Sequence, residues 1–119
     1  MIIKNIPRTI TTNVYRNTHH FKLNSLKSDF HDDLFYHLKE QKIDFRPLSV
    51  PCIIEFTFRY KNGNCKRDLD GDYPSVKFTL DSLVSMGFLK DDDRDNISGI
   101  NFRDGGKGDN TFDIEIFSV

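Results

Sequence analysis

The amino-acid sequence predicts an α+β fold with a mixed or antiparallel sheet and two helices, in the order β-α-β-α-β-β. Segments typical of strands occur near the N-terminus, in the middle of the chain and twice near the C-terminus, and the last three of them alternate apolar and polar residues. Two segments with helical spacing of apolar residues separate the first three of these strands. A chain of 119 residues without an internal repeat or a linker is expected to form one domain, residues 1–119.

The N-terminal elements are predicted as a strand, a loop and a helix. Residues 1–10 form a short strand that ends near a proline. Residues 11–26 have weak periodicity, which predicts an exposed loop. Its basic residues Arg16 and Lys22 lie among aromatic residues, so the loop can either follow a DNA backbone or simply be anchored to the surface. A helix is expected to begin at Ser28, whose hydroxyl suits a cap, and to end before Pro47.

The remaining elements follow from stronger patterns. Residues 52–60 alternate between apolar and polar side chains, which predicts a strand with one buried face. Apolar residues at helical spacing predict a second helix over residues 75–88. Residues 97–103 and 111–119 also alternate, and the glycine-rich connection between them predicts a C-terminal hairpin.

Composition narrows the class of protein. A hydrophobic content of 37% with eleven phenylalanines predicts a folded globule. We see no basic and apolar leader and no long apolar run, so we expect no membrane partner and a cytoplasmic location. Cys52 and Cys65 lack the spacing of a metal or redox motif and are expected to be free thiols.

The charge is unevenly distributed along the chain. Residues 1–67 carry twelve Lys and Arg against six Asp and Glu, a balance of +6. Residues 68–119 carry five against twelve, a balance of −7, which gives the net charge of −1. A basic half followed by an Asp-rich half suits a protein that binds both a polyanion and a cation, although clustering of solvated charge by chance is the competing explanation.

Two acidic segments are the candidate chemical site. Asp68, Asp70 and Asp72 alternate directly after a predicted strand, and Asp91–Asp93 follow the next helix. Alternate side chains of an extended segment share a face, and Mg²⁺ usually takes one or two carboxylates together with water. A calcium loop of the EF-hand type is excluded, because its glycine and glutamate positions hold Tyr73 and Thr79. A solvated acidic turn without function remains the simpler alternative.

From Lys66 onward the chain resembles the RusA family of Holliday junction resolvases. The family pattern is an Arg-Asp-Leu-Asp-Asn segment, a lysine, an Asp-Ala-Leu helix, a glycine and an Asp-Asp pair. The matching residues here are Arg67, Asp68, Leu69, Asp70, Lys77, Asp81, Leu83, Gly87, Asp91 and Asp92. The sequence departs from the pattern at Gly71, which replaces the asparagine, and by three extra residues before Lys77.

The resemblance implies a Mg²⁺ site, which Mn²⁺ can also fill, held by Asp68, Asp70 and Asp92. It implies that Lys77 stabilises charge on the reacting phosphate, and Asp91 is then an outer or alternative ligand. A second alignment pairs Asp70 with Asp72 as the metal ligands.

The resemblance also implies a substrate and an assembly. The substrate is a four-way DNA junction cut by paired symmetric nicks, and the enzyme is a homodimer without an organic cofactor. A twofold dimer matches the twofold symmetry of the junction. Lys66 and Arg67 are expected to bind the DNA backbone without reading its sequence. Two other functions stay open: a branched-DNA-binding module whose site has decayed, and a nuclease for flaps or single strands.

Overall fold

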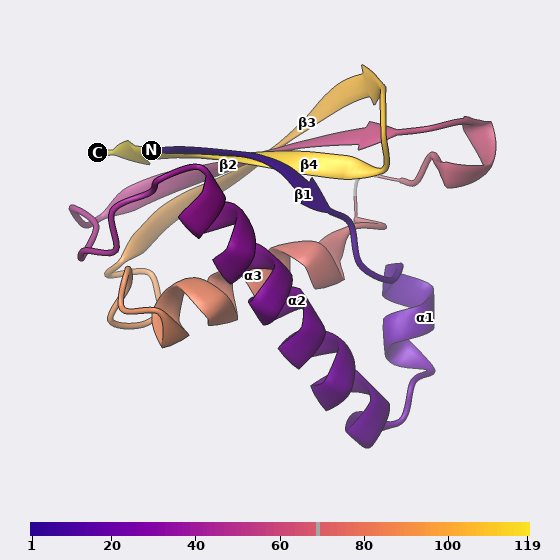
Figure 1. Ribbon diagram of the computed structural model, residues 1–119, viewed down its shortest axis with the longest axis horizontal. Coiled ribbons are helices and arrows are strands. Elements are labelled where there is room, and N and C mark those ends of the chain that lie inside the picture. The colour runs from indigo at the N-terminus through magenta and orange to yellow at the C-terminus, as the bar shows by residue number, and fades with distance from the viewer. Residues whose placement is uncertain (69) are drawn as a thin grey trace.

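A computed structural model describes residues 1–68 and 70–119, in which the helices cover one face of a four-stranded sheet (Figure 1). The α+β class and the mixed sheet are as predicted. The elements in chain order are β1 (Ile2–Pro7), α1 (Thr12–Arg16), α2 (His20–Glu40), β2 (Cys52–Tyr60), a 3-10 turn (Gly63–Cys65), α3 (Tyr73–Ser85), β3 (Ile97–Lys107) and β4 (Thr111–Ser118).

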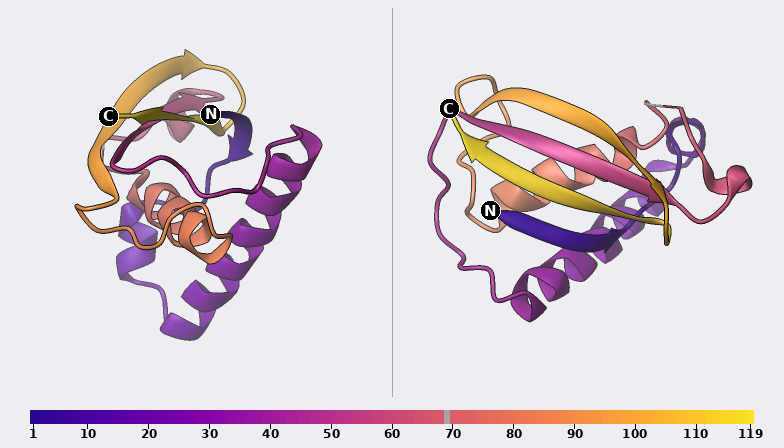
Figure 2. Two further views of the ribbon diagram at one scale, coloured as in Figure 1. Left: turned by 90° about the vertical axis from the view of Figure 1, so that its left-hand side faces the viewer. Right: turned by 90° about the horizontal axis from the view of Figure 1, so that it is seen from above.

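The sheet has the strand order β1-β4-β2-β3, seen from above in Figure 2. β4 is antiparallel to β1 and β2, whereas β3 is parallel to β2. The predicted C-terminal hairpin is therefore wrong, because β3 and β4 lie on opposite sides of β2. The physical reason is that β2 is the most apolar strand, and its fully buried Ile54 and Phe56 need a neighbour on each side.

The last residues of β3 and the connection to β4 pass the end of β2 at close range. A Cβ atom at Gly105 of β3 would lie 2.8 Å from Cγ of Arg59 and 3.1 Å from the Phe58 carbonyl oxygen, and in the connection the amide of Gly108 donates to the Tyr60 carbonyl at 3.0 Å. The glycine-rich segment was interpreted as a hairpin turn, but it serves this crossing instead.

The predicted loop over residues 11–26 is also wrong, since this segment contains α1 and the start of α2. The Thr11 hydroxyl accepts a hydrogen bond from the amide of Val14, and Nδ1 of His19 accepts one from the amide of Phe21. The buried residues of α2 begin only at Phe30. The first ten residues of the helix therefore lack the apolar stripe by which sequence analysis recognises a helix.

A single core joins the sheet to the helices. It contains Phe30, Leu34 and Leu38 of α2, Val76, Phe78 and Leu83 of α3, and the inward side chains of the strands. α3 begins two residues earlier than predicted, with Pro74 in its first turn. Across residues 1–68 and 70–119, no helix combines the length and the apolar character needed to cross a membrane.

Candidate functional site: a basic cleft beside the acidic loop

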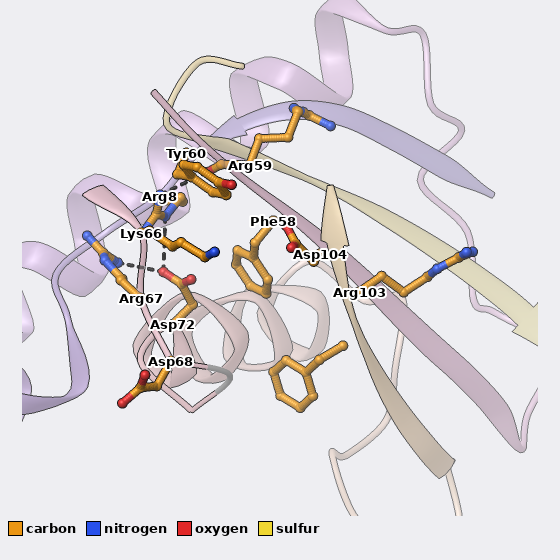
Figure 3. A pocket seen from close by; sticks show the side chains of 11 residues that line it. Arg8, Phe58, Arg59, Tyr60, Lys66, Arg67, Asp68, Asp72, Arg103 and Asp104 are labelled. Atoms are coloured by element: carbon orange, nitrogen blue, oxygen red, sulfur yellow. Dashed lines mark hydrogen bonds and ion pairs between the residues drawn. The ribbon is translucent and has the colours of Figure 1, made fainter. Parts of the chain in front are cut away.

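A cleft of about 390 Å³ opens where the parallel strands β2 and β3 end. Side chains at the carboxyl ends of parallel strands meet the loops that follow them, which is where open α/β sheets commonly bind ligands. The side chains that line the cleft are Arg8, Phe58, Arg59, Tyr60, Lys66, Arg67, Asp68, Asp72, Phe102, Arg103 and Asp104 (Figure 3).

Asp72 is the structural centre of the cleft wall. Its Oδ1 accepts hydrogen bonds from Nε of Arg8 at 3.1 Å and from Nη1 of Arg67 at 2.5 Å (Figure 3). The side chains of Arg8 and Asp72 are only 3% and 8% exposed. Arg8 also donates to the backbone carbonyls of Arg59 and Cys65, both at 2.8 Å. Arg8 therefore ties the end of β1 to β2 and to the following loop, and the charge of Asp72 is neutralised by two guanidinium groups.

The guanidinium group of Arg59 is paired with a carboxylate of the sheet outside the cleft. Its two terminal nitrogens each lie 2.8 Å from a different carboxylate oxygen of Asp113 on β4. These hydrogen bonds lower the pKa of the Asp113 carboxyl below its ordinary value. Arg59 is thus bound to the sheet rather than available to a ligand.

Aromatic rings form the apolar wall of the cleft. The rings of Phe58 and Phe102 are nearly parallel, at 18°, with their centroids 6.4 Å apart. Phe102 is 40% exposed, because β3 is an edge strand that the helices leave partly uncovered. The ammonium group of Lys66 lies 5.5 Å from the centroid of the Tyr60 ring. The cleft therefore combines flat apolar surface with positive charge.

A second pocket, of about 290 Å³, shares Arg67 and Asp68 with the cleft. It is also lined by Asp70 and Arg16, so it gathers four of the residues predicted for the site. The carboxylates of Asp68 and Asp70 make no hydrogen bond or ion pair within residues 1–68 and 70–119. Leu69 of the matched motif lies outside the described residues.

Gly71 has a local structural reason. Its amide donates to the Asp68 carbonyl at 2.8 Å, and its own carbonyl accepts from the amide of Thr12. A Cβ atom here would lie 2.8 Å from Cβ of Arg67 and 3.0 Å from the Asp68 carbonyl oxygen. A side chain at position 71 would therefore press on both neighbours, which favours glycine there.

Lys77 and Lys22 lie outside both pockets. Nζ of Lys77 is 3.7 Å from Oδ2 of Asp81, one helical turn away, and Lys27 of α2 reaches the same oxygen at 3.0 Å. In this arrangement Lys77 belongs to a polar contact between α2 and α3. Lys22 is exposed in the first turns of α2.

Asp91 and Asp92 lie at the opposite end of the sheet from Asp68 and Asp70. The loop that holds them leads into the start of β3, which pairs with Cys52 at the start of β2. Asp68 and Asp70 instead follow the end of β2. The eight residue steps along β2 amount to about 26 Å at roughly 3.3 Å per residue. One chain therefore does not bring the predicted three carboxylates together.

The carboxylates present fit a Mg²⁺ ion only in part. Two exposed carboxylates that line one pocket meet the usual protein share of a Mg²⁺ site, which is completed by water and substrate. The described part of the chain has no group of three potential ligands from His, Cys, Asp or Glu. Asp72 is a poor ligand because two arginines already hold it, and this geometry favours the pair Asp68 and Asp70.

Sequence reasoning missed Arg8 and Phe102. Arg8 directly follows the proline that ends β1, and nothing in the local pattern indicates that it is buried. Phe102 lies on a strand that was predicted, but its exposure depends on which strand is at the edge. No protein-family model and no curated protein matches the sequence.

Proposed function

We propose that the protein is a metal-dependent endonuclease that cuts branched DNA, with the four-way junction as its substrate. The observation that carries the proposal is the pocket in which Asp68 and Asp70 lie beside Arg16 and Arg67. Free carboxylates bind a divalent cation, while guanidinium groups next to them bind the phosphates that the cation must reach.

Each group would have a separate task. Asp68 and Asp70 would hold the metal, which supplies polarisation of the phosphodiester and an acidified water. Lys66 borders the adjoining cleft and has no carboxylate within 4 Å among residues 1–68 and 70–119, so it is available to neutralise phosphate. Arg67 keeps one hydrogen bond to Asp72 and is 22% exposed, which suits a residue that positions both the loop and the DNA.

The edges of the sheet support a homodimer through β3. The β1 edge is covered, because the side-chain amide of Gln41 binds both the amide and the carbonyl of Lys4 at 2.8 and 2.7 Å. A register irregularity between Ile3 and Ile6 further disrupts that edge. β3 is the other edge, eleven residues long and without proline. Two copies can pair there about a twofold axis through their main chains, whereas Phe102 projects from the face of the strand, perpendicular to that edge.

This pairing would also solve the separation of the carboxylates. In a twofold pair the two β3 strands run antiparallel, so the start of one lies beside the end of the other. Asp92 of the partner subunit would then lie at the same end of the joined sheet as Asp68 and Asp70. The metal site would draw its ligands from both copies.

A junction cleavage assay tests the proposal. Wild-type protein is incubated with a labelled four-way junction in Mg²⁺, Mn²⁺ or EDTA, beside Asp70→Asn and the exposed control Asp109→Asn. Paired symmetric nicks are expected with metal for wild type and Asp109→Asn, and none for Asp70→Asn. If wild type left the junction uncut in both Mg²⁺ and Mn²⁺, the proposed nuclease activity would be refuted.

Mixed dimers test the shared site. Asp70→Asn and Asp92→Asn are each expected to be inactive alone. When they are mixed and allowed to exchange subunits, a site shared between copies leaves one intact site in each mixed dimer, and single nicks return. If each copy carried its own complete site, every site in the mixture would lack one aspartate and no activity would return.

One observation favours a second function, a junction-binding module that does not cut. The described residues of one chain hold no three-ligand group, and the Asp72 carboxylate is neutralised. Such a module would bind the four-way junction equally well in EDTA and in Mg²⁺ and leave it uncut. Competition with Y-shaped and linear DNA separates both functions from a flap or single-strand nuclease, which would prefer the unpaired substrates.

A further inference from the structure

We infer that the cleft at the ends of β2 and β3 binds an unpaired nucleobase of the DNA, stacked against Phe102. This inference rests on the proposed function, since it names the part of the DNA that lies beside the acidic pocket. Its central residue, Phe102, belongs to neither the acidic motif nor the metal site.

The first step is the apolar wall. Phe56, Phe58 and Phe102 form a triangular cluster of rings within 26° of parallel on the helix side of the sheet, with all three centroid distances between 6.1 and 6.4 Å. Phe56 is fully buried, whereas Phe102 lines the cleft and is 40% exposed. An exposed aromatic ring backed by a cluster of this kind offers a stacking surface for another flat ring.

The second step is the shape and charge of the space. About 390 Å³ is within the range of roughly 300–1,000 Å³ in which small ligands bind. Five cationic and three anionic side chains line the cleft. Arg59 is paired with Asp113, and Arg103, which is 66% exposed, is paired with Glu55; both of these carboxylates lie outside the lining. Lys66 has no carboxylate within 4 Å among residues 1–68 and 70–119 and is the lining cation available to a ligand. A flat apolar ring that carries phosphates on either side matches this surface.

The third step is the position relative to the acidic pocket. Arg67 and Asp68 line both the cleft and the pocket that holds Asp70. The two spaces adjoin, so a nucleotide whose base enters the cleft has the neighbouring pocket within reach of its phosphate. Bases at the centre of a branched DNA are the easiest to unstack, because the helices are interrupted there.

Binding in EDTA tests this inference apart from cleavage. The DNA is a duplex with one unpaired thymidine, compared with the same duplex carrying an unpaired abasic nucleotide. Wild type is expected to bind the thymidine form about 5- to 150-fold more tightly, which corresponds to roughly 1–3 kcal/mol of stacking per base. Phe102→Ala and Phe102→Leu are expected to lose this preference, and Phe102→Tyr to keep it.

Two controls identify the source of any change. Phe117 on β4 is also about two-fifths exposed, at 41%, but lies outside the cleft, so Phe117→Ala should keep the preference. Lys66→Ala should weaken both DNA forms equally, because it contacts phosphate. Circular dichroism and thermal unfolding check that each variant is folded. If Phe102→Ala does not fold, Phe102→Leu serves as the variant without an aromatic ring.

The outcomes separate this inference from the proposed function. Equal binding of the two forms by wild type would overturn the inference, and so would loss of the preference in Phe117→Ala. If thymidine monophosphate at equal concentration displaced the DNA completely, the cleft would be a free-nucleotide site and the DNA assignment would fail. Cleavage of junctions without a base preference would refute the inference alone, whereas absence of binding to any DNA would refute the proposed function as well.

Discussion

Replacing Asp72 by asparagine should destabilise the protein far more than the same change at Asp68 or Asp70. The Asp72 carboxylate is 8% exposed and is held by Arg8, which is 3% exposed, and by Arg67. Asparagine has almost the same shape but no charge, so the buried Arg8 guanidinium would keep its charge and lose its counterion. Removal of one partner from a buried ion pair typically costs about 3–5 kcal/mol.

That cost is a large share of the total stability. Folded domains are stable by about 5–15 kcal/mol, so Asp72→Asn should strongly lower the urea midpoint of unfolding. Asp68 and Asp70 are exposed, and their asparagine variants should stay within about 0.5 kcal/mol of wild type. Equilibrium urea unfolding at pH 7, followed by circular dichroism, measures all three variants under the same conditions.

Mg²⁺ binding by the same three variants, measured by calorimetry, distinguishes the two alignments of the acidic motif. If Asp72→Asn were as stable as wild type and yet failed to bind Mg²⁺ in calorimetry, then Asp72 would be a metal ligand and our interpretation of it would be wrong. If Asp70→Asn bound Mg²⁺ as wild type does, the pair Asp68 and Asp70 would be refuted.

Three further predictions follow from other contacts. Asp113→Asn should lower the free energy of unfolding by about 1–3 kcal/mol at pH 7. Because the folded-state pKa of Asp113 is lowered, the stabilisation by its carboxylate is complete above the unfolded-state pKa of about 3.9 and is lost as the pH falls through the folded-state pKa. Urea unfolding of wild type and Asp113→Asn between pH 3 and pH 7 should therefore show their stabilities converging in acid. Gly71→Ala should cost about 1–3 kcal/mol in urea unfolding, whereas Gly63→Ala, with no atom within 4 Å of its new Cβ, should cost at most about 0.5–1 kcal/mol. Lys66→Ala should reduce the slope of log affinity against log salt for junction DNA by about 1, and Lys61→Ala, an exposed lysine outside the cleft, should leave it unchanged.

The elements that sequence analysis predicted correctly are those with a strong local pattern. β2 alternates apolar and polar residues over its whole length, and α3 carries apolar residues at helical spacing together with Pro74 in its first turn. The start of α2 was missed because none of its first ten residues is buried, although Leu26 packs in part against the core, and because its cap is a histidine rather than one of the usual capping residues.

The order of the strands depended on information that is not local. A glycine-rich connection permits either a hairpin or a crossing over a neighbouring strand. The outcome was decided by β2, whose buried Phe56 pairs with Phe102 on one side and with Ile114 on the other. The exposure of Phe102, and with it the apolar wall of the cleft, follows from that order and could not be predicted before it.

The candidate site was predicted in part for a related reason. Alternation along the chain was enough to group Asp68 and Asp70, and the neighbouring Arg67 came with them. Alternation alone did not show that Asp72 differs from Asp68 and Asp70. Asp72 is held by Arg8, which lies 64 positions away in the sequence, so no local pattern reveals the contact. Long-range partners of this kind decide which member of an acidic motif is structural and which is available to a ligand.

The topology itself constrains how the two acidic segments can cooperate. Parallel neighbours such as β2 and β3 require a crossover, so the residues after β2 and those before β3 necessarily lie at opposite ends of the sheet. The two ends of β2 are about 26 Å apart along the strand. In the proposed enzyme a second copy of the chain would bring Asp92 to the end of the sheet that holds Asp68 and Asp70, since an antiparallel neighbour at the β3 edge would reverse the two ends. A protein that remained a monomer on DNA would accordingly bind the junction through its cleft without a complete metal site.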